Sequence, residues 1–116
     1  MIIAFADDQT ATVFPDIASV RRDCEAVDVE AGVYRFFDEY GRRLKPRIIN
    51  PVLRTSLPLA VKLIDGGDFD LEPDLDDEGV AFDQLLAKTI AIEPDKPFAT
   101  PTDLEHYVRE NRRRLN

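Results

Sequence analysis

Residues 33–49, VYRFFDEYGRRLKPRII, decide the type of fold. The first five residues carry aromatic side chains on both faces, which is typical of a central strand covered on both sides. Residues 38–41 follow as a turn, in which Gly41 can take the positive φ that other residues avoid. The chain then returns through residues 42–49, where alternate positions are apolar. The stretch therefore predicts two antiparallel strands joined by a tight turn.

The return strand separates charged from apolar side chains. Because successive side chains on a strand point to opposite faces, Arg43, Lys45 and Arg47 share one face. The other face carries Leu44, Pro46 and Ile48. A proline cannot donate a hydrogen bond to a neighbouring strand, so Pro46 favours an edge position or a bulge. The cationic face is either a solvated surface or a contact for an anion.

Residues 68–76 alternate acids with apolar residues or proline. On an extended strand the acids form one row, here named the acid ladder, which consists of Asp68, Asp70, Glu72, Asp74 and Asp76. The opposite face, which is expected to pack, carries Phe69, Leu71, Pro73 and Leu75. Neighbouring carboxylates on one strand face lie about 6.6–6.8 Å apart, so their repulsion is about 0.6 kcal/mol in water. A solvated strand tolerates that cost.

The acid ladder has a structural interpretation and a functional one. As a structural feature it is a charged edge strand that discourages aggregation, or a row neutralised by Arg43, Lys45 and Arg47 lying beside it. As a functional feature it is a docking face for a basic partner, where complementary charge raises association rate and selectivity. Residues 74–79 imitate the start of an EF-hand loop, but the twelfth position is Leu85, where a glutamate is required. We therefore assign no metal ligand.

Residues 61–64 precede the ladder and are predicted to pair with it as a second hairpin. A three-residue loop over residues 66–68 places the apolar residues of both strands on one face, with Lys62 opposite Glu72. A two-residue loop at the two glycines would place the apolar residues of 61–64 on the same face as the carboxylates, because a shift of one residue exchanges the buried and solvated faces of a strand. We therefore expect the three-residue loop.

The other elements follow from shorter patterns. Strands are expected at residues 2–6, 10–14 and 27–30, and helices at about residues 15–25, 80–91 and 102–113. The last helix has the clearest start, because Thr102 and Glu105 have the spacing of a capping box. Together the elements predict one α+β domain over residues 1–116, with an antiparallel sheet of about five or six strands built from hairpins and two or three helices on one face.

Composition and charge bound the role of the chain. Its 116 residues are 44% hydrophobic and 33% charged, which is typical of one globular domain. Cys24 is the only cysteine, so no internal disulfide forms, and no apolar stretch approaches a membrane span. We expect a soluble, cytoplasmic protein. For the same reason we expect no membrane partner. The net charge of −8 disfavours nucleic acid and favours basic proteins, although residues 41–64 carry six bases and no acid.

Candidate catalytic groups are few. His106 is the only histidine, and helical spacing turns it away from the apolar side of the last helix, whereas Cys24 belongs to a buried stripe. Neither serine lies in a nucleophile elbow, and no glycine-rich phosphate loop is present. The arginines at positions 109 and 112–114 complement the negative end of a helix dipole. The sequence predicts no catalytic residue and no cofactor, and disfavours an enzyme.

The functional hypothesis is a small interaction or inhibitor module, comparable to immunity or antitoxin proteins. It docks a basic protein partner through Asp68, Asp70, Glu72, Asp74 and Asp76. The alternative is a carboxylate-dependent enzyme or metal-binding domain centred on residues 65–83, where nine acids and no base occur. A third hypothesis is a nucleic-acid contact through residues 42–54, in which Arg43, Lys45 and Arg47 are possible anion contacts; it would show steep salt dependence.

Overall fold

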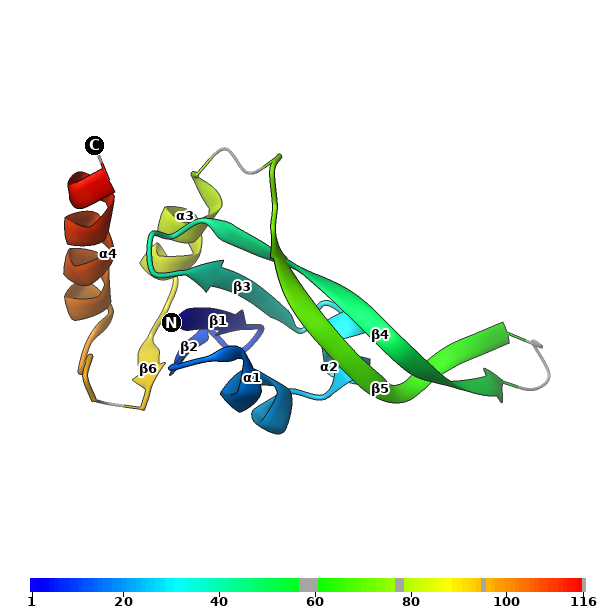
Figure 1. Ribbon diagram of the computed structural model, residues 1–116. Coiled ribbons are helices and arrows are strands. Elements are labelled where there is room, and N and C mark those ends of the chain that lie inside the picture. The colour runs from blue at the N-terminus through cyan, green and yellow to red at the C-terminus, as the bar shows by residue number, and fades with distance from the viewer. Residues whose placement is uncertain (57–60, 77–78, 95, 116) are drawn as a thin grey trace.

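The computed structural model describes residues 1–56, 61–76, 79–94 and 96–115 (Figure 1). Its strands are β1 (Ile2–Ala6), β2 (Thr10–Phe14), β3 (Tyr34–Asp38), β4 (Arg43–Ser56), β5 (Val61–Pro73) and β6 (Ala91–Glu93). Its helices are α1 (Ile17–Asp23), α2 (Ala26–Glu30), α3 (Ala81–Ala87) and α4 (Pro101–Leu115). The strands form one sheet in the order β5-β4-β3-β1-β2-β6, in which the β2–β6 pair is parallel and the others are antiparallel. The predicted α+β class with a mostly antiparallel sheet is confirmed.

Strand β3 lies inside the sheet and contributes to a core on each face. Phe37 packs with the buried faces of α3 and α4, and its neighbour Phe36 packs with those of α1 and α2. Strand β1 does the same, because Ile3 joins the first cluster and Ile2 the second. The helices therefore cover both faces of the sheet, whereas the sequence analysis expected them on one. The apolar runs in both strands required this, since a strand buried on two faces needs a cover on each.

Helix α1 begins later than predicted. Its N-cap is Asp16, whose carboxylate accepts hydrogen bonds from the backbone N–H and the hydroxyl of Ser19, both at 2.9 Å. These bonds hold the pKa of the Asp16 carboxyl below its usual value, because they stabilise the charged form. Pro15 therefore lies outside the first helical turn.

The predicted strand at residues 27–30 is wrong, because this segment is helix α2. Its buried residues, Ala26 and Val29, are three positions apart, which is helical spacing. Gly32 ends the helix with a φ of 78°, donating to the carbonyl of Val29 while Val33 donates to that of Asp28. This is the Schellman arrangement, in which glycine takes the left-handed conformation at low cost. Gly32 therefore ends a helix, where the sequence pattern predicts a turn between two strands.

The predicted hairpin between residues 61–64 and the acid ladder is also wrong. Strand β5 runs without interruption from Val61 to Pro73 and pairs along its length with β4. The two glycines lie within β5, near irregularities in its register with β4, and do not form a loop. Glu72 consequently faces Lys45, whereas Lys62 faces Thr55. The two strands form a long ribbon that projects from the rest of the sheet (Figure 1), and the reversal between them at residues 57–60 lies outside the described part of the chain.

Strand β4 leaves β3 soon after the turn. The register between them covers Arg43 and Leu44, and the turn closes with Gly41 at a φ of 72°. Beyond Leu44 the strand continues with β5 as its partner, and Pro46 lies opposite Leu71. Pro46 therefore pairs with β5 on one side and with no residue of β3 on the other. This confirms the predicted edge position.

Helix α3 ends at Ala87, earlier than the predicted residue 91. Phe82 and Leu86 are buried as expected, but Ile90 is 73% exposed and its N–H donates to the carbonyl of Gln9. The chain then forms β6, which the sequence analysis missed, and buries Ile92. A three-residue strand is too short for a period-2 pattern to show in the sequence.

Helix α4 is confirmed, but its capping box lies two residues earlier than predicted. The Thr100 hydroxyl accepts a hydrogen bond from the Asp103 N–H at 3.3 Å, and the Asp103 carboxylate accepts one from the Thr100 N–H at 3.2 Å. Pro101 then occupies the first helical position, where its missing N–H has no consequence.

The position of this cap gives a testable prediction. Replacing Thr100 by alanine is expected to lower the free energy of unfolding by about 1 kcal/mol, because one N-terminal N–H loses its acceptor. Replacing the exposed Thr102 by alanine is the matched control and should change stability by less than about 0.5 kcal/mol. Urea denaturation measures both, and a larger loss for Thr102→Ala would restore the cap first predicted.

Candidate partner-binding surface on the β4–β5 ribbon

The acid ladder is extended through residue 73 and then turns. Phe69 is 1% exposed and Leu71 is partly buried, as predicted, but Leu75 is 94% exposed. Pro73 is exposed as well, so the prediction that Pro73 and Leu75 pack is wrong. The strand ends at Pro73. Asp74 accepts a hydrogen bond from the Asp76 N–H at 3.0 Å, which forms a turn in place of two further strand positions.

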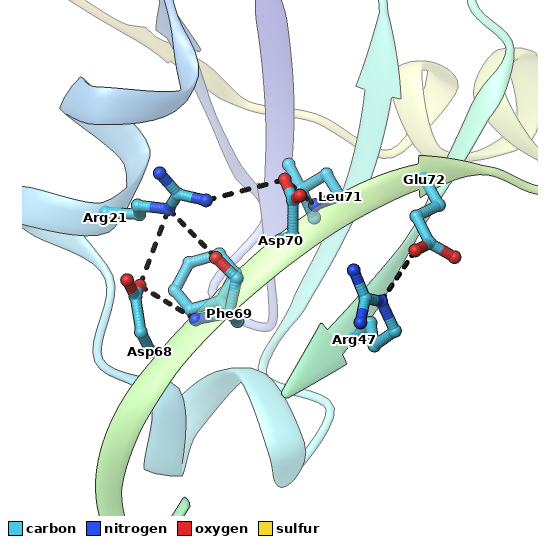
Figure 2. A network of polar contacts seen from close by, with 7 residues as sticks. All are labelled: Arg21, Arg47, Asp68, Phe69, Asp70, Leu71 and Glu72. Atoms are coloured by element: carbon cyan, nitrogen blue, oxygen red, sulfur yellow. Dashed lines mark hydrogen bonds and ion pairs between the residues drawn. The ribbon is translucent and has the colours of Figure 1, made fainter. Parts of the chain in front are cut away.

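The predicted cationic face lies directly beside the acid ladder. Lys45 is opposite Glu72 and Arg47 is opposite Asp70 in the β4–β5 register. Directly opposite residues in an antiparallel pair share a face, so the two charged rows lie side by side on the same face of the ribbon. Arg47 pairs with Glu72 at 2.6 Å (Figure 2). Arg43 and Asp74 form a further ion pair at 3.8 Å. These bases already face acids, so mutual neutralisation accounts for this part of the ladder. The contact of the same bases with an external anion stays a prediction.

The first two acids of the ladder are held from a different element. Arg21 of α1 donates from Nε to the carbonyl oxygen of Phe69 at 2.9 Å. The same guanidinium lies 3.4 Å from the carboxylate of Asp68 and 3.5 Å from that of Asp70 (Figure 2). Sequence analysis missed Arg21. Its only signal was its place beside buried Val20 on α1, which does not specify an acid 47 residues away.

Side chains also close the outer edge of β5. Asp68 accepts a hydrogen bond from the Phe69 N–H at 2.8 Å, and Asp70 accepts one from the Leu71 N–H at 2.9 Å. Arg21 occupies the Phe69 carbonyl, and Pro73 has no N–H. The N–H and the carbonyl of Phe69 and the N–H of Leu71, which a further strand would need, are thus already engaged. An edge protected in this way disfavours docking by strand addition, so recognition on it falls to side chains.

A hollow of about 300 Å³ opens beside this edge, between β5 and the junction of α1 and α2. Asp68 and Gly67 line it from β5, and Arg22 and Glu25 line it from the junction. Residues 23–30, which include α2, carry four acids and no base. The lining of the hollow combines two acids with two bases, because Arg21 and Arg22 lie there with Asp68 and Glu25. Across it the ladder meets the acidic segment that leads into α2, which lies against the ribbon in Figure 1.

The other candidate groups, Cys24 and His106, lie on opposite sides of the sheet, although Cys24 also lines the hollow. Cys24 is buried on the α1–α2 side of the sheet, whereas His106 is exposed on α4, which packs on the other side. A Cys24–His106 dyad is therefore excluded. Burial also raises the pKa of the Cys24 thiol, which keeps it in the protonated, weakly nucleophilic form at neutral pH.

The described residues contain no group of three or more His, Cys, Asp and Glu side chains that could hold a metal ion. Two positions of the EF-hand-like stretch, residues 77 and 78, lie outside the described part of the chain.

A larger hollow of about 490 Å³ lies between α3 and α4, but its charged residues pair with neighbours. Arg109 lies 2.6 Å from Glu105, and Asp83 lies 3.3 Å from Arg112. Arg112 also donates to the carbonyl oxygen of Tyr40 at 2.7 Å, so it ties the end of α4 to the turn before β4. A ligand site would need polar groups that converge on one point and have no other partner. The charged side chains of this hollow instead pair with one another or with neighbouring residues.

Comparisons with protein-family models, with curated proteins and with solved structures found no match. Within the described ranges, no helix combines the length and apolar composition that crossing a membrane requires.

Proposed function

We propose that this protein is a small interaction or inhibitor module, comparable to immunity or antitoxin proteins, that docks a basic protein partner through the acid ladder. One observation carries the proposal. Asp68, Asp70 and Glu72 keep 56%, 42% and 50% of their side-chain surface exposed, although each of them faces an arginine. Ion pairs this exposed contribute about 0–1 kcal/mol each. A partner's cations can therefore compete for these carboxylates at small cost.

The distribution of charge supports the same partner chemistry. The chain carries a net charge of −8, and Asp68 of the ladder lines the same hollow as Glu25 of the acidic segment at residues 23–30. Such a field attracts a basic protein and raises its association rate, an effect that salt weakens. Because the outer edge of β5 is closed by side chains, the docking mode we propose uses the carboxylates and leaves the strand backbone in place.

The test is capture of a partner from native cell extract at low and high ionic strength. The ladder variant combines Asp68→Asn, Asp70→Asn and Glu72→Gln. Its matched control combines Asp7→Asn, Glu93→Gln and Glu110→Gln, which remove the same charge at positions outside β4 and β5. We expect the wild type and the control to bind a basic protein in a salt-sensitive manner. The ladder variant should bind that protein about 10- to 100-fold more weakly.

Two results would contradict the proposal. One is equal binding of the partner by the ladder variant and the control variant, which would show that binding depends on net charge and not on the position of the carboxylates. The other is capture that high salt leaves unchanged or that selects an acidic protein, since docking by carboxylates requires neither.

A further inference from the structure

The outer edge of β5 holds a guanidinium group in a defined set of acceptors. The carbonyl oxygen of Phe69 takes a hydrogen bond of 2.9 Å from Arg21, and the carboxylates of Asp68 and Asp70 flank it at 3.4 and 3.5 Å (Figure 2). Arg21 reaches this place from α1, far away in the sequence. We infer that it occupies the position that an arginine of the basic partner takes on docking. This inference rests on the proposed function and specifies its recognition group.

The acceptors favour an arginine over a lysine. Three acceptor groups lie along the strand, and a planar guanidinium presents five N–H donors in a fixed fork, whereas an ammonium is a point charge. The two carboxylates are also oriented in advance, because each accepts a hydrogen bond from the backbone N–H of the next residue. A group held in this way loses little freedom when it binds a cation.

Arg21 fills this position incompletely. Only its contact with Phe69 has hydrogen-bond length, and its distances to both carboxylates exceed the 2.7–2.9 Å typical of charge-assisted bonds. Its stem is fixed to α1, which limits the approach, whereas a partner's side chain can enter from solvent. The hollow beside Asp68 provides space on that side. Arg21 is 36% exposed, so it can leave its acceptors without unpacking the core.

Arg21 therefore acts as an internal competitor for the partner's arginine. A surface pair worth up to about 1 kcal/mol corresponds to a roughly fivefold reduction in the affinity of the incoming group. Removing the Arg21 side chain should abolish this competition and leave the acceptors in place, since the strand itself holds the carboxylates.

The experiment titrates the protein with N-acetyl-arginine-N-methylamide, with the lysine analogue as the probe of equal charge. Binding is followed by NMR at the Phe69 and Leu71 amides, whose N–H groups contact the two carboxylates. We expect Arg21→Ala to bind the arginine probe about fivefold more tightly than wild type. Arg113→Ala, the control of equal charge change, should bind like wild type because Arg113 lies on α4 and pairs with Glu110 there. The affinity of Arg21→Lys for the arginine probe should lie between those of wild type and Arg21→Ala, since lysine keeps the charge but lacks the planar fork of N–H donors.

Two outcomes would overturn the inference. Equal gains in Arg21→Ala and Arg113→Ala would show a general charge effect, and equal binding of both probes would show attraction of any cation. The proposed function fails separately. If the ladder variant captures the partner normally while Arg21→Ala still binds the arginine probe at these amides, the guanidinium site stands and the docking function falls. If the reverse is found, docking uses the acids without an arginine in this place.

Discussion

Replacing Phe37 by alanine is expected to lower the free energy of unfolding by about 3–5 kcal/mol, as for other buried phenylalanines. Phe37 is fully buried in β3, and its ring contacts those of Phe5 and Phe82 edge to face, with centroids 5.5 Å apart in each case. The Phe5 and Phe82 rings contact each other at the same distance. Removing one ring from this closed set leaves a cavity between the sheet and α3, which the strand backbone cannot collapse to fill.

Urea denaturation measures this loss, and two further variants define its cause. Phe37→Leu retains most of the apolar volume and should lose clearly less stability than Phe37→Ala. Arg35→Ala changes an exposed neighbour on the same strand and should stay within about 0.5 kcal/mol of wild type. A loss below about 1 kcal/mol for Phe37→Ala would contradict a core built on these three rings.

The elements that sequence predicts well are those whose signal is local. Residues 33–49 combine an aromatic strand, a glycine turn and an alternating return strand, and all three features occur in the structure. The apolar runs in β1 and β3 also contain the information that both faces of the sheet are covered, because Phe36 and Phe37 cannot both point to one side.

The errors arise where a short segment fits two patterns or where pairing is not local. Residues 27–30 satisfy a strand alternation, yet Ala26 and Val29 pack with helical spacing, and the decision comes from the contacts of α2 with the sheet. The glycines before the ladder fit a hairpin loop equally well. What excludes that loop is the length of β4, which offers β5 a partner along its whole length.

The candidate site shows the same limit. Alternation alone predicts the row of acids and the burial of Phe69, and it leaves open whether the bases of the return strand lie beside that row. Register settles this, by placing Arg47 opposite Asp70. Arg21 was beyond reach of any pattern, because its contact with β5 depends on how α1 lies against the ribbon. Sequence therefore predicts the chemistry of the surface, whereas the tertiary structure determines which acids meet which bases.

Replacing Phe69 by alanine is expected to cost about 3–5 kcal/mol of stability and to loosen the ribbon from the body of the protein. Phe69 is 1% exposed, stacks on Phe36 with centroids 6.2 Å apart, and belongs to the cluster that contains Val20 of α1. Among the β5 residues whose burial the structure describes, Phe69 is the fully buried member of this cluster, and Leu71 packs against it partly buried.

The same residue also receives the Arg21 hydrogen bond on its carbonyl, so packing and polar contact coincide at one position. Two single variants separate them. Arg21→Ala should cost only about 0–1 kcal/mol, because the pair is exposed, whereas Phe69→Ala should cost several times more. Leu75→Ala, at a position 94% exposed, is the control for losing an apolar side chain near the end of the strand. Thermal and urea denaturation rank the three variants, and hydrogen exchange at the Leu71 amide reports the release of the ribbon. If Arg21→Ala proved as destabilising as Phe69→Ala, the ribbon would be anchored by charge, and Arg21 could not leave its acceptors for an incoming partner.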